Sequence, residues 1–214
     1  MNASRRIGDI ELLRGLAVFG ILIHHAQGNL LAWTTPAMDR FYAYFNIGHT
    51  IDLFFAISGF VIARDLIPKV QEVGKDRVGF FRLAIAFWIR RAYRLLPSAW
   101  VCLACIVLLS LLFNQSNAFG SVRANFAGAV AAVLQVANMH FAFNLQSGLG
   151  LGATYHFWSL SLEEQFYLAL PLMLFFSGRA FPWLAAALVL AQLLSVRPEG
   201  AAVPYAWVFR TDAL

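Results

Sequence analysis

Ionisable side chains within apolar segments are the first sign of chemistry in this 214-residue sequence. Arg14 and His25 share the first apolar segment, Ile10–Leu31, eleven residues apart. Eleven steps of 100° return to nearly the same helix face, with a rise of about 16 Å. The histidine can take a proton from a hydroxyl near neutral pH, and the arginine can grip a phosphate with two parallel hydrogen bonds. The bland alternatives are a snorkelling arginine and a hydrogen-bonded structural histidine.

Three further charged side chains raise the same question. Asp52 lies in a second apolar segment, Phe41–Ala63, where a carboxylate needs a partner, and its structural role would be to pair with a buried arginine. Arg91 and Arg94 stand three residues apart on one predicted helix face. An anion between them would offset their repulsion, so they could hold the phosphates of a cytosolic cofactor. The alternative is a basic inner segment beside lipid headgroups.

A fifth apolar segment, Tyr155–Phe176, carries two adjacent glutamates, Glu163 and Glu164. Glu163 and Tyr167 are four residues apart and therefore share a helix face. We expect one glutamate to pair inward and the other to reach the membrane interface. A salt bridge to one of the arginines is the structural alternative.

Composition predicts the scaffold that must position these residues. The chain is 60% hydrophobic and 13% charged, with mean hydropathy +0.67, whereas soluble domains average about 25% charged. Backbone groups in lipid must be satisfied within their own segment, so we predict an all-α polytopic membrane bundle of about six spans plus the start of a seventh near Val203. The six apolar segments are Ile10–Leu31, Phe41–Ala63, Leu95–Phe113, Phe126–Phe143, Tyr155–Phe176 and Phe181–Val196. The fourth and sixth are short and could be tilted or re-entrant.

The basic residues predict orientation. They concentrate between the second and third segments, where the amphipathic stretch 80–94 is expected to lie as a helix in the membrane interface. This distribution favours a cytoplasmic N-terminus and explains the net charge of +5 without a nucleic-acid partner. The weak point is Asn144–Thr154, which falls on the inner side without a basic residue; a re-entrant fourth segment would reverse everything after it. Cys102 and Cys105 are expected to be small buried hydrophobes, and no metal site is predicted.

Four groups of residues, in this order, resemble the acyltransferase-3 family of multi-spanning membrane O-acyltransferases. They are Ile10–Ala17 with His25, Asp52–Phe55 with Ser58–Phe60, Arg91 and Arg94 before Pro97, and Trp158–Leu160 with Glu163 and Gln165–Tyr167. Each group alone is weakly specific, whereas the four together are quite specific. The resemblance implies one membrane acyltransferase domain over residues 1–214, matching the N-terminal part of the family, and the ending Arg210–Leu214 resembles a later motif cut short.

The resemblance further implies that an acyl group, commonly acetyl, moves from acyl-CoA to a hydroxyl of a carbohydrate or glycolipid acceptor. The expected location is the cell membrane, typically the bacterial inner membrane, and no permanently bound cofactor is expected. Catalysis is assigned to His25, Glu163 and Asp52, acyl-CoA binding to Arg14, Arg91 and Arg94, and acceptor contact to Trp158 and Tyr167. Whether His25 acts as a base or carries the acyl group stays open. The competing hypothesis is a transporter or flippase, in which the same charges form a substrate or proton path.

Overall fold

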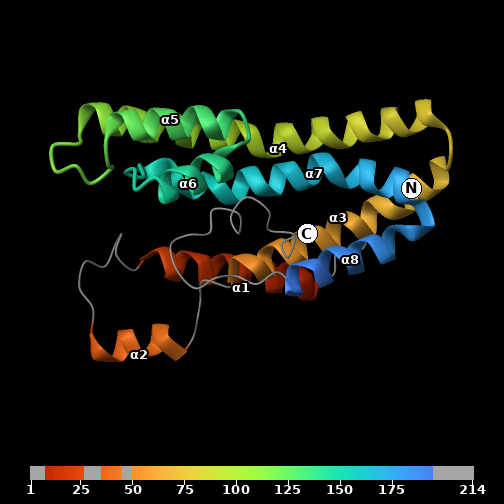
Figure 1. Cartoon of the computed structure of the whole chain (residues 1–214), viewed down its shortest axis with the longest axis horizontal. Coiled ribbons are helices and arrows are strands. Elements are labelled where there is room, and N and C mark those ends of the chain that lie inside the picture. The colour runs from red at the N-terminus through yellow and green to blue at the C-terminus, as the bar shows by residue number, and fades with distance from the viewer. Residues whose placement is uncertain (1–7, 27–34, 45–49, 195–214) are drawn as a thin grey trace. The chain divides into compact units, whose positions relative to one another are not determined.

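The computed structural model is all-α, as the composition predicts, with helices and no strand in the part of the chain it describes (Figure 1). The described residues are 8–26, 35–44 and 50–194. The elements are α1 (Gly8–Ala26), α2 (Pro36–Tyr44), α3 (Thr50–Val73), α4 (Arg77–Leu112), α5 (Val122–Val133), α6 (Ala137–Gln146), η2 (Ala153–His156), α7 (Phe157–Ser177), η3 (Gly178–Ala180) and α8 (Phe181–Leu194). The chain divides into two compact units, residues 1–65 with 213–214 and residues 66–212, and each is described by itself.

Close approach between α1 and the start of α3 organises the first unit. A Cβ atom added to Gly20 would come within 2.5 Å of Cγ2 of Thr50, so glycine is what allows the two backbones to approach. The hydroxyl of Tyr42, on α2, donates a hydrogen bond to the carbonyl of Ile23 over 3.1 Å. The described residues of the second predicted segment, Phe41–Ala63, belong to α2 and α3.

Helix α4 is one continuous helix of 36 residues, which corresponds to about 54 Å. Its first turn is capped by Asp76, whose side chain accepts a hydrogen bond from the backbone N–H of Val78. The predicted separation between an interfacial helix at 80–94 and a span beginning at Leu95 is absent, because the helix passes through Pro97 without ending. The basic and apolar stretches thus form a single rod.

The fourth predicted segment is broken, and its interpretation as one span is wrong. Residues 134–136 separate α5 from α6, and Gln135 has φ +58°, a left-handed conformation that ends the first helix. At 12 and 10 residues, the two helices reach only about 18 and 15 Å, well short of a bilayer core of about 30 Å. They pack side by side as a hairpin, which we call the α5–α6 hairpin (Figure 1).

Both ends of the α5–α6 hairpin lie together. The backbone N–H of Ala153 donates to the carbonyl of Phe119 over 3.1 Å, and the N–H of Thr154 donates to Oδ1 of Asn125 over 3.4 Å. The chain that enters the hairpin therefore runs beside the chain that leaves it. Helix α7 begins at the end of the second unit where α4 finishes.

Helices α4 and α7 pack antiparallel. The rings of Phe80 and Phe175 stack with centroids 4.0 Å apart, and the indole N–H of Trp88 donates to the backbone carbonyl of Tyr167 over 3.1 Å. Farther along, Leu103 belongs to an apolar cluster against which Phe157 packs. The three levels fix the register of the helix pair.

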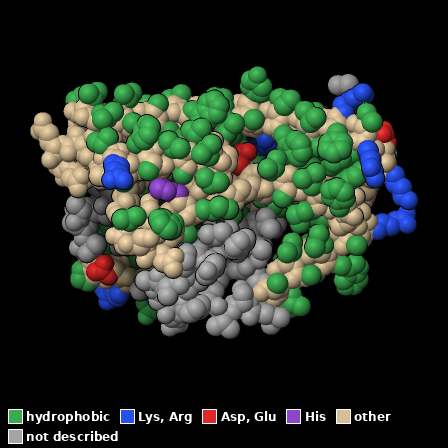
Figure 2. All heavy atoms as spheres, turned by 45° about the horizontal axis from the view of Figure 1, so that its top comes forward, with side chains coloured by type: hydrophobic (Ala, Val, Ile, Leu, Met, Phe, Trp, Pro, Cys, Tyr) green, Lys and Arg blue, Asp and Glu red, His purple; other side chains and the backbone are tan. Residues whose placement is uncertain are grey.

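Two helical runs, Arg77–Leu112 and Ala153–Ala191, are long and apolar enough to cross a membrane, with mean hydropathy 2.4 and 1.6. They indicate a membrane protein. The prediction of six spans is not confirmed, and the seventh near Val203 lies outside the described residues. Apolar side chains dominate the face in Figure 2. Cys102 and Cys105 are exposed on α4 rather than buried, so that expectation was wrong.

Candidate functional site

A charged cluster lies between α4 and α7 in the second unit, formed by Arg91, Glu163, Glu164 and Tyr167. The Tyr167 hydroxyl donates a hydrogen bond to the Glu163 carboxylate. The guanidinium carbon of Arg91 lies 4.4 Å from the centre of the Tyr167 ring, within the range of a cation–π interaction. Tyr167 is only 2% exposed, so these contacts are made inside the protein.

The fold explains why these side chains meet. One helical turn separates Glu163 from Tyr167, which places both on one face of α7. The antiparallel register brings Arg91 opposite them, since Trp88 on the same helix already binds the backbone of Tyr167. The predicted shared face of Glu163 and Tyr167 is confirmed by their hydrogen bond.

The charge balance of the cluster limits what it can bind. Arg91 supplies one positive charge, whereas Glu163 and Glu164 supply two negative charges when both are ionised. Oε1 of Glu164 is buried and makes no hydrogen bond within the described part of the chain. An anion at Arg91 therefore requires a second cation nearby or a protonated carboxyl group, and a hydrogen-bond donor suits the free oxygen of Glu164.

Arg94 occupies a different environment from Arg91. Arg91 is half-buried against Tyr167, while Arg94 and Arg90 are exposed on α4. Of the predicted arginine pair, Arg91 is thus the half-buried member and Arg94 the exposed member. Binding of a single anion by Arg91 and Arg94 stays a prediction.

In the first unit, α1 carries Arg14 and His25, which are predicted to lie on nearly the same helix face. Arg14 and His25 are both half-buried and Ala17 between them is fully buried, whereas His24 is exposed. The guanidinium carbon of Arg14 lies 5.8 Å from the ring centre of Phe54. This contact places Arg14 beside α3, and the shared face of Arg14 and His25 stays a prediction.

Asp52, also half-buried, precedes Phe54 by two residues on α3. Arg14, His25 and Asp52 all belong to the first unit, and the charged cluster belongs to the second. A joint role of these three residues and the charged cluster in one catalytic site therefore stays a prediction.

The two residues assigned to the acceptor are not brought together. Trp158 is 8% exposed and stacks on Phe141, with centroids 6.3 Å apart. It precedes Tyr167 by nine positions (167 − 158), and nine steps of 100° leave the two side chains on opposite faces of α7. Both rings are buried in protein contacts.

Sequence reasoning overlooked a network of amide side chains at the tip of the α5–α6 hairpin. Nε2 of Gln165 donates to the carbonyl of Gln135 over 2.7 Å and to Oδ1 of Asn138 over 2.9 Å. In return, Nδ2 of Asn138 donates to Oε1 of Gln165 over 3.2 Å. Asn138 is fully buried. An amide in an apolar segment was the signal that could have found it.

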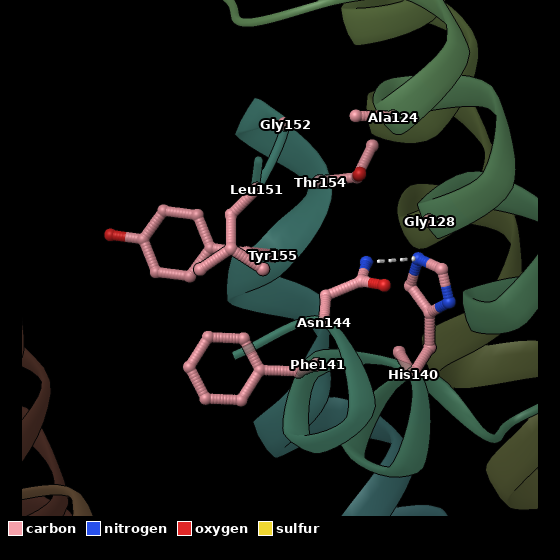
Figure 3. A pocket seen from close by; sticks show the side chains of 10 residues that line it. Ala124, Gly128, His140, Phe141, Asn144, Leu151, Gly152, Thr154 and Tyr155 are labelled. Carbon is pink, nitrogen blue, oxygen red and sulfur yellow. Dashed lines mark hydrogen bonds between the residues drawn. The ribbon is translucent and has the colours of Figure 1, made fainter. Parts of the chain in front are cut away.

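A second overlooked feature is a small pocket between α5, α6 and η2 (Figure 3). His140 and Asn144 lie one turn apart on α6, and Nε2 of His140 is 3.0 Å from Nδ2 of Asn144. The ten lining residues are Ala124, Gly128, Ala137, His140, Phe141, Asn144, Leu151, Gly152, Thr154 and Tyr155. A histidine inside an apolar segment was again the available signal.

Fold and site together define a helical membrane protein with charged and amide side chains buried between its helices. A family model described as an acyltransferase domain matches residues 7–207, so the chain belongs to the acyltransferase-3 family. No solved structure matches it.

Similar proteins include two from Staphylococcus aureus. The candidate O-acetyltransferase SACOL0978 of strain COL is 32% identical over 173 residues, which cover 79% of this chain and 25% of that protein. O-acetyltransferase OatA of strain NCTC 8325 is 28% identical over 179 residues, covering 82% and 26%. The chain thus spans about a quarter of the length of these relatives.

Proposed function

We propose that this chain is part of a membrane O-acyltransferase that moves an acyl group, most simply acetyl, from acyl-CoA to a hydroxyl of a carbohydrate or glycoconjugate. The supporting observation is the contact of Arg91 with Tyr167, itself bound to Glu163, between two helical runs apolar enough to cross a membrane. Burying such a cluster is costly, and the acyltransferase family supplies a use for it. The names of the relatives agree with acetyl transfer.

In this proposal each side chain has a separate role in the reaction. His25 takes the proton of the acceptor hydroxyl, whose oxygen attacks the thioester carbonyl of acyl-CoA. The carbon–sulfur bond then breaks, and the CoA thiolate leaves and takes up a proton. Arg91, with Arg94 and Arg14, holds phosphate groups of CoA. Glu163 holds Tyr167 beneath Arg91, and Asp52 orients the base.

The membrane orientation belongs to the same proposal. A cytoplasmic N-terminus puts the basic first half of α4 on the inner side, where acyl-CoA is found. Because α7 begins at the end of the unit where α4 finishes, Asn144–Thr154 then falls on the outer side. A segment without basic residues is ordinary there, so a re-entrant α5–α6 hairpin supports the proposed orientation.

The test is acyl transfer by the natural full-length protein in membranes supplied with radiolabelled acetyl-CoA. The proposal expects label to move to a carbohydrate fraction and to be released by mild alkali, as an O-ester is. Membranes that lack the protein serve as the control. Absence of both label transfer and acyl-CoA binding would overturn the proposal and favour transport of a substrate instead.

A further inference from the structure

The α5–α6 hairpin holds two polar side chains, His140 and Asn144, that pair with each other and with no other side chain in the part of the chain that the structure describes. Its buried amides Asn125 and Asn138 hydrogen-bond to the backbone or to α7, and these bonds account for their presence. His140 and Asn144 instead contact each other and line the pocket between α5, α6 and η2. Asn144 is only 7% exposed. Polar groups at such a place are costly and commonly mark a binding site.

The size of this pocket defines its occupant. Its volume is about 10 Å³, the space that one water molecule or one hydroxyl group needs. Glycines create this space. A Cβ atom at Gly128 would lie 2.2 Å from Oγ1 of Thr154, and one at Gly152 would lie 2.2 Å from Oδ1 of Asn125. Any larger side chain at Gly128 would collide with Thr154, which lines the pocket.

The chemical groups that line the pocket further restrict the kind of ligand that it can bind. None of the ten lining residues carries a carboxylate, an ammonium or a guanidinium group, so a phosphate or carboxylate ligand has no counter-charge there. His140, Asn144 and the Thr154 hydroxyl offer both hydrogen-bond donors and acceptors in Figure 3. A hydroxyl group, which donates and accepts at once, uses both kinds.

On the side of Asn144 away from His140, the residues that line the pocket include two aromatic rings (Figure 3). The rings of Phe141 and Tyr155 stack with centroids 6.0 Å apart, and Leu151 lies beside them in the lining. An aromatic face offers apolar area at the side of a polar group. A sugar ring matches this combination, since its C–H face is apolar and its edge carries hydroxyls.

We propose that the His140–Asn144 pocket is a subsite for one hydroxyl of the carbohydrate acceptor, with the sugar ring against Phe141 and Tyr155. This deepens the proposed function and rests on it. The pocket and the charged cluster lie at different levels along the helix axis, because Thr154 in η2 precedes Glu163 in α7 by nine residues, about 14 Å of helix rise. Acceptor and acyl-CoA phosphates would therefore bind at separate places in the second unit.

The first test measures both Michaelis constants of the full-length enzyme in nanodiscs, with a methyl hexoside as acceptor. Gly128→Ala should raise the acceptor KM about tenfold, equivalent to about 1.4 kcal/mol, and leave the acetyl-CoA KM within twofold. Gly150→Ala is the matched control, because nothing lies within 4 Å of its added Cβ atom. An unchanged acceptor KM, or an equal rise in both constants, would overturn the subsite.

The second test does not depend on catalysis. Saturation-transfer NMR follows binding of the methyl hexoside to the wild type and to Thr154→Val, which removes the hydroxyl while keeping the shape, and His140→Gln. Loss of the signal in both variants, but not in the exposed control His24→Gln, supports the subsite. Wild-type binding retained by both folded variants overturns it. A wild type that binds the hexoside but transfers no acetyl group would overturn the proposed function alone.

Discussion

Gln165 holds the tip of the α5–α6 hairpin against α7, so replacing it should loosen the second unit in a measurable way. Gln165→Leu keeps an apolar body of similar size but removes three hydrogen bonds, of 2.7, 2.9 and 3.2 Å, to Gln135 and Asn138. It also leaves the fully buried Asn138 amide and the carbonyl of Gln135 without that partner.

The expected cost follows from these contacts. Interhelical hydrogen bonds in membrane proteins contribute about 0.6 kcal/mol on average and up to about 2 kcal/mol each. A buried polar group left unpaired costs about 1–3 kcal/mol. We therefore expect Gln165→Leu to lower the free energy of unfolding by about 2–4 kcal/mol. The double variant Asn138→Leu/Gln165→Leu should cost less than the sum of the single variants, by about 1 kcal/mol or more, because neither amide is then left alone.

The assay is reversible unfolding of the full-length protein from mixed micelles with increasing SDS, followed by tryptophan fluorescence. Gln146→Leu provides the matched control, since it makes the same chemical change at the exposed end of α6 and should stay within about 0.5 kcal/mol of the wild type. The reasoning fails if Gln165→Leu unfolds as the wild type does. It also fails if the double variant shows strictly additive costs, since the two amides would then not be energetically coupled.

Three further outcomes are expected from His25, Arg91 and Tyr167, which are assigned to catalysis, donor binding and acceptor contact. His25→Ala should abolish acetyl transfer while the protein still inserts into membranes, and His24→Ala, which changes an exposed ring, should retain activity; an active His25→Ala variant would remove that residue from the mechanism. Arg91→Lys should raise the acetyl-CoA KM about tenfold, because an ammonium group replaces a planar fork that stacks on an aromatic ring, whereas the exposed Arg90→Lys should leave it unchanged. Tyr167→Phe keeps the ring beneath the arginine but loses a hydrogen bond to a carboxylate, so kcat/KM should fall by about ten- to hundredfold, corresponding to about 1.5–3 kcal/mol; wild-type kinetics would show that the hydroxyl has no such role.

Features that depend on helical periodicity could be predicted from the sequence. A spacing of eleven residues predicts a shared face for Arg14 and His25, both half-buried on α1, and the contact of Glu163 with Tyr167 follows from a spacing of four. These relations hold within one helix and need no knowledge of its neighbours. They also explain why the family resemblance could be recognised from short motifs.

Features that depend on a single backbone torsion or on neighbouring helices could not be predicted from the sequence. The average hydropathy of Phe126–Phe143 is the same whether the chain runs straight or turns back. Glutamine is not a residue type that indicates a positive φ, yet Gln135 has a φ of +58°. Likewise, Pro97 looks like the boundary of a helix, yet α4 continues through it. The exposure of Cys102 reflects which face of α4 the other helices cover, and that is a property of the assembled unit.

The α5–α6 hairpin depends on the α7 motif, which comprises Trp158–Leu160, Glu163 and Gln165–Tyr167. When a helix breaks inside an apolar environment, the carbonyl groups at the break lose their usual partners and need new ones. At Gln135 the new partner is the side chain of Gln165, which lies two residues after Glu163 on α7. A glutamine in this position lets α5 and α6 stop short and turn, and it fixes the turn beside the helix that carries Glu163 and Tyr167. The polar residues of the α7 motif therefore serve two purposes. Glu163 and Tyr167 belong to the charged cluster, and Gln165 holds the turn of the hairpin beside it.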